Sequence, residues 1–136
     1  MPDVRRPRGL LDTSVVIDLE RVDVASLPLE MAISVVTLAE LAAGPHATKD
    51  AAERARRQDR LQRTEATFDP LPVDAEVARA YGRVYAAVVA SGRKARGRRA
   101  VDLLIAATAV SVGVPLFTRN PGDFEGLAGL VEIVLV

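Results

Sequence analysis

The chain has 136 residues, of which 49% are apolar and 26% are charged, a composition typical of one globular domain and unlike that of a disordered chain. Its 18 Lys and Arg residues balance its 18 Asp and Glu residues, so no net charge draws the whole protein toward nucleic acid or an anionic membrane. The absence of cysteine excludes disulfides, thiolate catalysis and cysteine-based zinc sites. We expect a single domain over residues 1–136.

The N-terminal segment predicts no export or membrane anchoring. Residues 1–9 are polar and basic, and only a few apolar residues follow before Asp12. This run is too short for the core of a signal peptide or for a membrane span. We therefore expect a cytoplasmic protein that does not contact a membrane.

The first half of the chain predicts strands that lead into helices. A short buried strand is expected over 9–12, followed by a helix over 15–19 with Ser14 as its N-cap. A second strand begins at Met31, and Ser34 or Thr37 then opens a helix that ends at residues 44–45. Charges of both signs dominate residues 49–65, which is typical of a solvated helix.

The second half continues this alternation. Residues 68–73 contain two prolines and suit a short strand or a turn. Asp74 caps a core helix whose predicted apolar face consists of Val77, Ala78, Tyr81, Val84, Tyr85, Val88 and Val89. A helix that is apolar on nearly all sides is expected from about Val101 to Val112, with strands over 114–117 and 131–136. The order predicts an α/β fold with a central, mostly parallel sheet of four to five strands and helices on both faces.

Three carboxylates lie where the sequence is otherwise apolar. Asp12, Glu40 and Asp102 are each the only charge in their segment. Burying an ionised carboxylate costs several kcal/mol unless it is paired or bound to a cation, so a shared metal ion is an economical explanation. Sites in open α/β sheets form beyond the carboxyl ends of strands, where Asp12 and Asp123 are both expected. Ligands that are all oxygen favour Mg²⁺ or Mn²⁺ over zinc.

Each acid also has an ordinary explanation. Asp12 and Asp102 can cap helices, Glu40 can pair with a buried arginine, and Asp123 can be a turn residue. The order of the motifs argues for a shared role, because LDTS around Asp12, the isolated Glu40, DLLIAATA from Asp102 and TRN–PGDF around Asp123 follow one another along the chain.

In this order the chain resembles the PIN-domain ribonucleases, and specifically the VapC-type toxins of bacterial type II toxin–antitoxin pairs. The resemblance implies a PIN-like fold and an acidic metal cluster of Asp12, Glu40, Asp102 and Asp123, supported by Ser14, Thr118 and Asn120. It also implies Mg²⁺-dependent endoribonuclease activity, with Mn²⁺ as a substitute, that leaves 5′-phosphate and 3′-hydroxyl ends. The implied partners are RNA, a cognate antitoxin whose tail packs along the toxin, and a second copy in a homodimer.

One basic segment is a candidate for RNA binding. Five of the seven residues over 93–99 are cations, namely Arg93, Lys94, Arg96, Arg98 and Arg99, and they directly precede the Asp102 helix. A solvated loop explains the same pattern. His46 is the only histidine, which excludes a metal-free nuclease with two histidines as general base and acid.

Two other classes of protein are compatible with parts of the pattern. A phosphoaspartate phosphatase would need a second acid two residues after Asp12, where this chain has Ser14. The remaining alternative is a catalytically inactive α/β module that uses segment 93–99 to bind RNA or an acidic protein. Metal-dependent RNA cleavage distinguishes the nuclease from this module.

Overall fold

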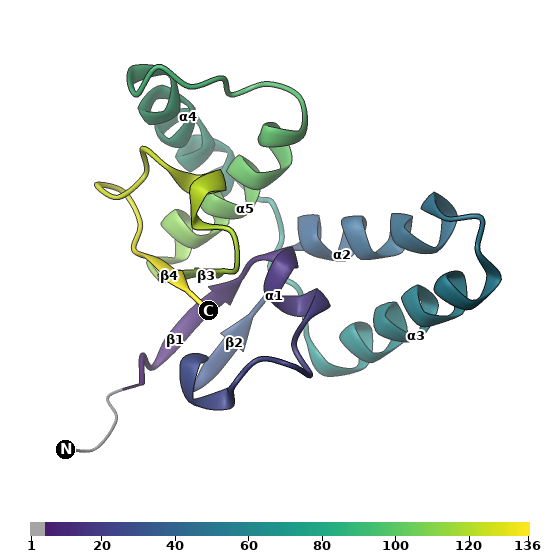
Figure 1. Ribbon diagram of the computed structural model, residues 1–136. Coiled ribbons are helices and arrows are strands. Elements are labelled where there is room, and N and C mark those ends of the chain that lie inside the picture. The colour runs from purple at the N-terminus through teal and green to yellow at the C-terminus, as the bar shows by residue number, and fades with distance from the viewer. Residues whose placement is uncertain (1–4) are drawn as a thin grey trace.

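The computed structural model describes residues 5–136, which form one α/β unit (Figure 1). The sheet contains β1 Arg8–Leu11, β2 Glu30–Ala32, β3 Leu116–Thr118 and β4 Ile133–Leu135, in the order β2-β1-β3-β4. All neighbouring strands are parallel, and Leu10 of β1 lies opposite Ala32 on one side and Leu116 on the other. The predicted α/β fold with a parallel sheet is confirmed.

Helices connect the strands. They are α1 Thr13–Ile17, α2 Val35–Ala43, α3 Ala51–Thr67, α4 Ala75–Ala90 and α5 Arg98–Val112, with short 3₁₀ helices η1 Val24–Ser26, η2 Gly44–Ala47 and η3 Pro121–Phe124. The pair α2 and α3 forms a hairpin that projects to one side of the sheet, whereas α4 packs on α5 (Figure 1). Among residues 5–136, no helix combines the length and the apolar composition that crossing a membrane requires.

Alternation along the two central strands creates a core on each face of the sheet. Leu10 and Leu116 belong to the core that α4 and α5 cover. Leu11 and Phe117, the next residues along each strand, belong to a second core with α1 and part of α2. Successive side chains of a strand point to opposite faces, so a strand buried on both sides requires this continuous apolar run.

The predicted starts of two helices are confirmed, and that of α1 is corrected. Asp74 caps α4 by accepting from the backbone N–H of Val77, and Ser34 caps α2 by accepting from that of Val36. Ser14 is not the N-cap of α1, because Asp12 occupies that position. Helix α1 therefore begins directly at the end of β1, and the Ser14 hydroxyl is free for another contact.

Two further predictions were wrong in detail. Helix α5 begins at Arg98 rather than near Val101, because the turn is made at Gly97, whose φ is +71°. On α4 the buried stripe is Val77, Ala80, Val84 and Val88, whereas Tyr85 and Val89 are 37% and 53% exposed. The predicted face covered two adjacent stripes of the helix, and only the stripe that meets α5 is buried. For residues 68–73 the sequence left open a short strand or a turn; they form no named strand and contribute one isolated bridge, from Leu71 to Ser34.

Candidate active site

Asp12 is a buried carboxylate at the carboxyl end of β1. Its side chain is only 4% exposed, and it does not cap the backbone of α1. Instead its Oδ2 accepts from the Ser14 hydroxyl at 2.7 Å and from the Thr118 hydroxyl at 2.9 Å. Both bonds use one oxygen, and no described residue donates to Oδ1, so this oxygen remains available to a ligand in the cleft that Asp12 lines.

The two hydroxyls that hold Asp12 are themselves oriented by the backbone. The N–H of Arg119 donates to the Ser14 hydroxyl at 3.1 Å, and the N–H of Asn120 donates to the Thr118 hydroxyl at 3.0 Å. Each hydroxyl therefore accepts from a fixed donor and directs its own proton to Asp12. This arrangement depends on the parallel neighbours β1 and β3 ending side by side.

Glu40 reaches the site from α2 and is held by a residue that the sequence analysis missed. Its Oε1 accepts from the Thr13 hydroxyl at 2.6 Å. The same hydroxyl lies 2.9 Å from that of Thr37, which is fully buried in α2. Glu40 could be predicted as a site residue because it is the only charge in an apolar segment. Nothing in the sequence pairs Thr13 with Thr37, 24 residues away.

Asp102 is the acid of the cleft whose pKa is most clearly changed by its surroundings. Burial, followed in order of importance by the charges of Asp12, Asp123 and Glu40, raises the pKa of its carboxyl from 3.8 to about 6. Arg99, one helical turn earlier on α5, opposes the rise. Arg99 also donates to the backbone carbonyl of Asp123 at 2.9 Å, which links the start of α5 to η3.

These side chains line one cleft of about 570 Å³ that opens at the carboxyl end of the sheet. Its wall consists of Asp12, Thr13, Ser14, Ile17, Glu40, Arg98, Arg99, Val101, Asp102, Asn120 and Asp123. The four predicted acids thus come together from the end of β1, from α2, from α5 and from η3. Thr118 lies behind the wall, fully buried beneath Asp12.

The donors in the cleft fit a hard divalent cation. Carboxylate, hydroxyl and amide oxygens are the ligands that Mg²⁺ and Mn²⁺ prefer. Burial and the charges of the three neighbouring acids together raise the pKa of Asp102, so a cation bound in the cleft would lower the cost of ionising it. Within residues 5–136, no three acidic or histidine side chains are already arranged to hold an ion. Carboxylates that repel one another are expected to close only around a cation.

The basic segment is divided by the start of α5. Arg98 and Arg99 lie in the first turn of the helix and line the cleft. Arg93, Lys94 and Arg96 precede the helix, are exposed and do not line it. Arg93 forms an ion pair with Glu125. Only two of the five predicted cations are therefore placed beside the acids.

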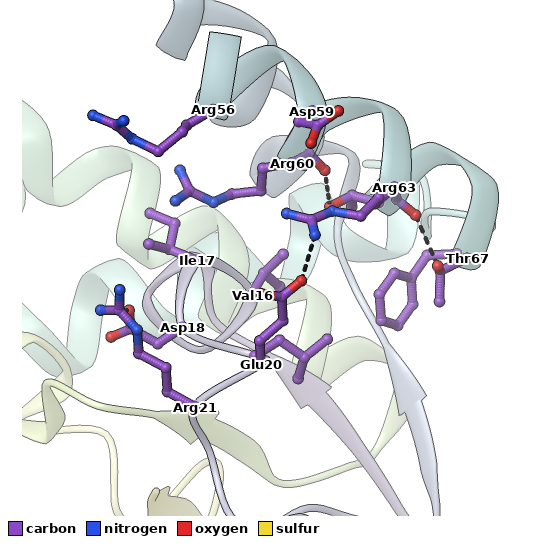
Figure 2. Close-up of a pocket in the computed structure, with 13 residues that line it drawn as sticks. Val16, Ile17, Asp18, Glu20, Arg21, Arg56, Asp59, Arg60, Arg63 and Thr67 are labelled. Atoms are coloured by element: carbon purple, nitrogen blue, oxygen red, sulfur yellow. Dashed lines mark hydrogen bonds and ion pairs between the residues drawn. The ribbon is translucent and has the colours of Figure 1, made fainter. Parts of the chain in front are cut away.

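A second groove adjoins the acidic cleft, with Ile17 in the walls of both (Figure 2). It has a volume of about 400 Å³ and runs between α1 and the second half of α3. Arginines at helical spacing line it from α3, namely Arg56, Arg60 and Arg63, of which Arg63 pairs with Glu20 across the groove. Ile17, 44% exposed, gives this groove an apolar floor at its junction with the cleft.

Comparison with known proteins agrees with the order of motifs. The PIN domain family matches residues 9–130. Ribonuclease VapC5 of Mycobacterium tuberculosis is 38% identical over 131 residues, which cover 94% of this chain and 93% of the relative. Ribonuclease VapC8 of the same species is 42% identical over 102 residues, or 74% of this chain and 89% of the relative.

A solved structure extends the similarity to three dimensions. The crystal structure of VapBC-5, a member of the VapBC family of toxin–antitoxin systems from Mycobacterium tuberculosis, contains a chain that superimposes with a TM-score of 0.84 at 41% identity. The match covers 96% of this chain and 99% of that one. On these similarities, the chain belongs to the PIN-domain family and, within it, to the VapC ribonucleases.

Proposed function

We propose that this protein is a Mg²⁺-dependent endoribonuclease that acts as the toxin of a bacterial type II toxin–antitoxin pair. The observation that carries the proposal is the meeting of four carboxylates in one cleft, where burial and the charges of the other three raise the pKa of Asp102. PIN-domain nucleases are generally metal-dependent, which is consistent with this donor set.

In this proposal Asp12 and Asp102 are the principal metal ligands, and Glu40 and Asp123 complete the site directly or through water. Mg²⁺ bound there would activate water for attack on the scissile phosphate and offset the charge that develops, leaving 5′-phosphate and 3′-hydroxyl ends. The protein orients the metal ligands and the RNA backbone. Ser14 and Thr118 fix Asp12, and Arg98 and Arg99 offer donors to phosphate oxygens at the rim of the cleft.

The test is cleavage of RNA by the purified protein with Mg²⁺, with Mn²⁺ and with chelator. Asp12→Asn keeps the shape of the side chain and removes its charge, so we expect loss of at least about 100-fold in activity. Asp69→Asn is the matched control, because Asp69 is exposed and lies outside the cleft. Activity that survives chelator, or that both variants retain, would contradict the metal site.

The basic segment requires a separate comparison. Substituting Arg98 and Arg99 with Gln should weaken RNA binding and flatten its salt dependence more than the same change at Arg93, Lys94 and Arg96, because only the first pair lines the cleft. If RNA binding depends on all five cations equally and no metal supports cleavage, the inactive binding module is the better description.

The proposed partner is a cognate antitoxin, as in the VapBC assembly whose toxin chain resembles this one. The groove between α1 and α3 shares Ile17 with the acidic cleft, so a peptide segment bound along this groove would end beside the cleft. Arg60→Glu on its wall should weaken the complex with the antitoxin without changing the fold.

A homodimer stays a prediction, and the exposed Tyr85 and Val89 on α4 are the first residues to substitute when testing it.

A further inference from the structure

Glu40 differs from the other acids in how it is held. Asp12 is buried, and Asp102 is half-buried on α5, whereas Glu40 lies on an exposed part of α2. An exposed glutamate rotates about three side-chain bonds, and confining it to one rotamer costs conformational entropy. Within residues 5–136, the Glu40 carboxylate accepts one hydrogen bond, from the Thr13 hydroxyl to Oε1. This bond therefore determines where the carboxylate lies.

Counting protons fixes the direction of the hydrogen bonds. The Thr13 hydroxyl has one proton and lies 2.6 Å from Oε1 of Glu40 and 2.9 Å from the Thr37 hydroxyl. An ionised carboxylate can only accept, so Thr13 donates to Glu40 and must accept from Thr37. Thr37 is fully buried and three residues before Glu40 on α2, which places both on the same face of the helix.

We propose that Thr13 and Thr37 are positioning residues, which form a relay of two hydroxyls that orients Glu40 toward the metal ligands. The buried Thr37 directs its proton to Thr13, which in turn directs its own proton to Glu40. Oε2 of Glu40 is left without a donor among the described residues and is available to a cation. The inference rests on the proposed function, because it assigns the oriented carboxylate to the metal site of that proposal.

The relay mirrors the arrangement at Asp12. Thr13 and Ser14 are consecutive residues at the start of α1, and each donates to one oxygen of a different carboxylate. In both cases the second oxygen is left for a ligand. One turn of helix, positioned by the end of β1, therefore orients two acids that come from segments 28 residues apart in the sequence.

The first experiment tests the contact without metal. Thr13→Val, Glu40→Ala and the double variant are unfolded with urea in the presence of chelator. If Thr13 holds Glu40, the double variant loses less stability than the two single variants predict together. Additive losses would overturn the inference. This measurement does not require the protein to bind metal or to cut RNA.

The second experiment measures Mn²⁺ affinity by calorimetry and by the electron paramagnetic resonance of the bound ion. We expect Thr13→Val to weaken binding about tenfold, Thr37→Val to weaken it less, and Thr13→Ser to restore it. Thr108→Val is the matched control, since Thr108 is also fully buried in a helix and bonds only to the carbonyl of Leu104 in that helix.

The outcomes separate the inference from the function on which it rests. Wild-type affinity in both Thr13→Val and Thr37→Val, or a loss no larger than that of Thr108→Val, would overturn the positioning role. Failure of the wild-type protein to bind Mn²⁺ would instead overturn the proposed metal site. Coupling without metal, together with a selective loss of Mn²⁺ affinity in the relay variants, supports both.

Discussion

Replacing Asp102 with Asn should stabilise the metal-free protein at neutral pH. The pKa of this carboxyl rises from an ordinary 3.8 to about 6 in the folded state, so ionising it is harder there than in the unfolded chain. Since each tenfold change in an equilibrium is worth about 1.4 kcal/mol, the penalty is at most about 3 kcal/mol. Asp102 lines an open cleft, where solvent screens its charge, and we therefore expect about 1–2 kcal/mol.

The sign of the effect follows from the two pKa values. Well below pH 3.8 the carboxyl is protonated in both states and costs nothing. As the pH rises toward 6 the unfolded chain releases its proton before the folded protein does, and above pH 6 the folded state carries the full penalty. The advantage of Asp102→Asn over wild type should therefore be only a small part of its full value at pH 4 and complete at pH 7.5.

The assay is urea unfolding of both proteins in chelator at several pH values. At pH 7.5 a gain of about 1–2 kcal/mol corresponds to a rise in Tm of roughly 3–8 °C for a domain of this size. Mg²⁺ should then stabilise the wild-type protein more than the variant, because the variant lacks one of the proposed metal ligands. A variant that is less stable than wild type at pH 7.5, or whose gain is the same at pH 4, would refute the reasoning.

Three further predictions concern the framework of the site. Thr118→Val removes a donor from the buried Asp12 and should lower the free energy of unfolding at pH 7.5 by about 1.5–3 kcal/mol, measured with urea; a loss under about 0.5 kcal/mol would contradict this. Gly9→Ala places a methyl 2.3 Å from the ring of Phe117, which is buried in the core, so the ring or the strand must shift and calorimetry should show a loss of about 1–3 kcal/mol; an unchanged Tm would show that the ring adapts without cost. Asp74→Ala removes the N-cap of α4 and should cost about 1 kcal/mol in urea, with Asp74→Ser recovering most of it.

The sequence by itself determined the fold class and the four acids that gather at the cleft. Buried parallel strands must be apolar on both faces, so the runs around Leu10 and Leu116 stand out, and each leads to polar residues at its carboxyl end. The acids stand out for the complementary reason. A charge in an apolar segment is costly unless something compensates for it, which made Asp12, Glu40 and Asp102 conspicuous before any geometry was known.

Helix faces and helix starts were predicted less well. The apolar residues of α4 span two adjacent stripes, and only packing against α5 decides that Ala80 is buried while Val89 is exposed. The positive φ of Gly97 starts α5 three residues early and moves Arg98 and Arg99 from an expected loop into the wall of the cleft. Local sequence patterns do not encode these choices, because they depend on which neighbouring element is present.

Only the tertiary structure decided how the acids are held. Hydroxyl groups have no characteristic spacing in the sequence, and the contacts from Thr118 to Asp12 and from Thr37 to Thr13 span 106 and 24 residues. They exist because parallel strands bring their carboxyl ends to one edge and because α1 starts there without a loop. The placing of single acids in apolar segments thus indicates that a carboxylate site is present, and the way the sheet is connected determines which oxygens face the cleft.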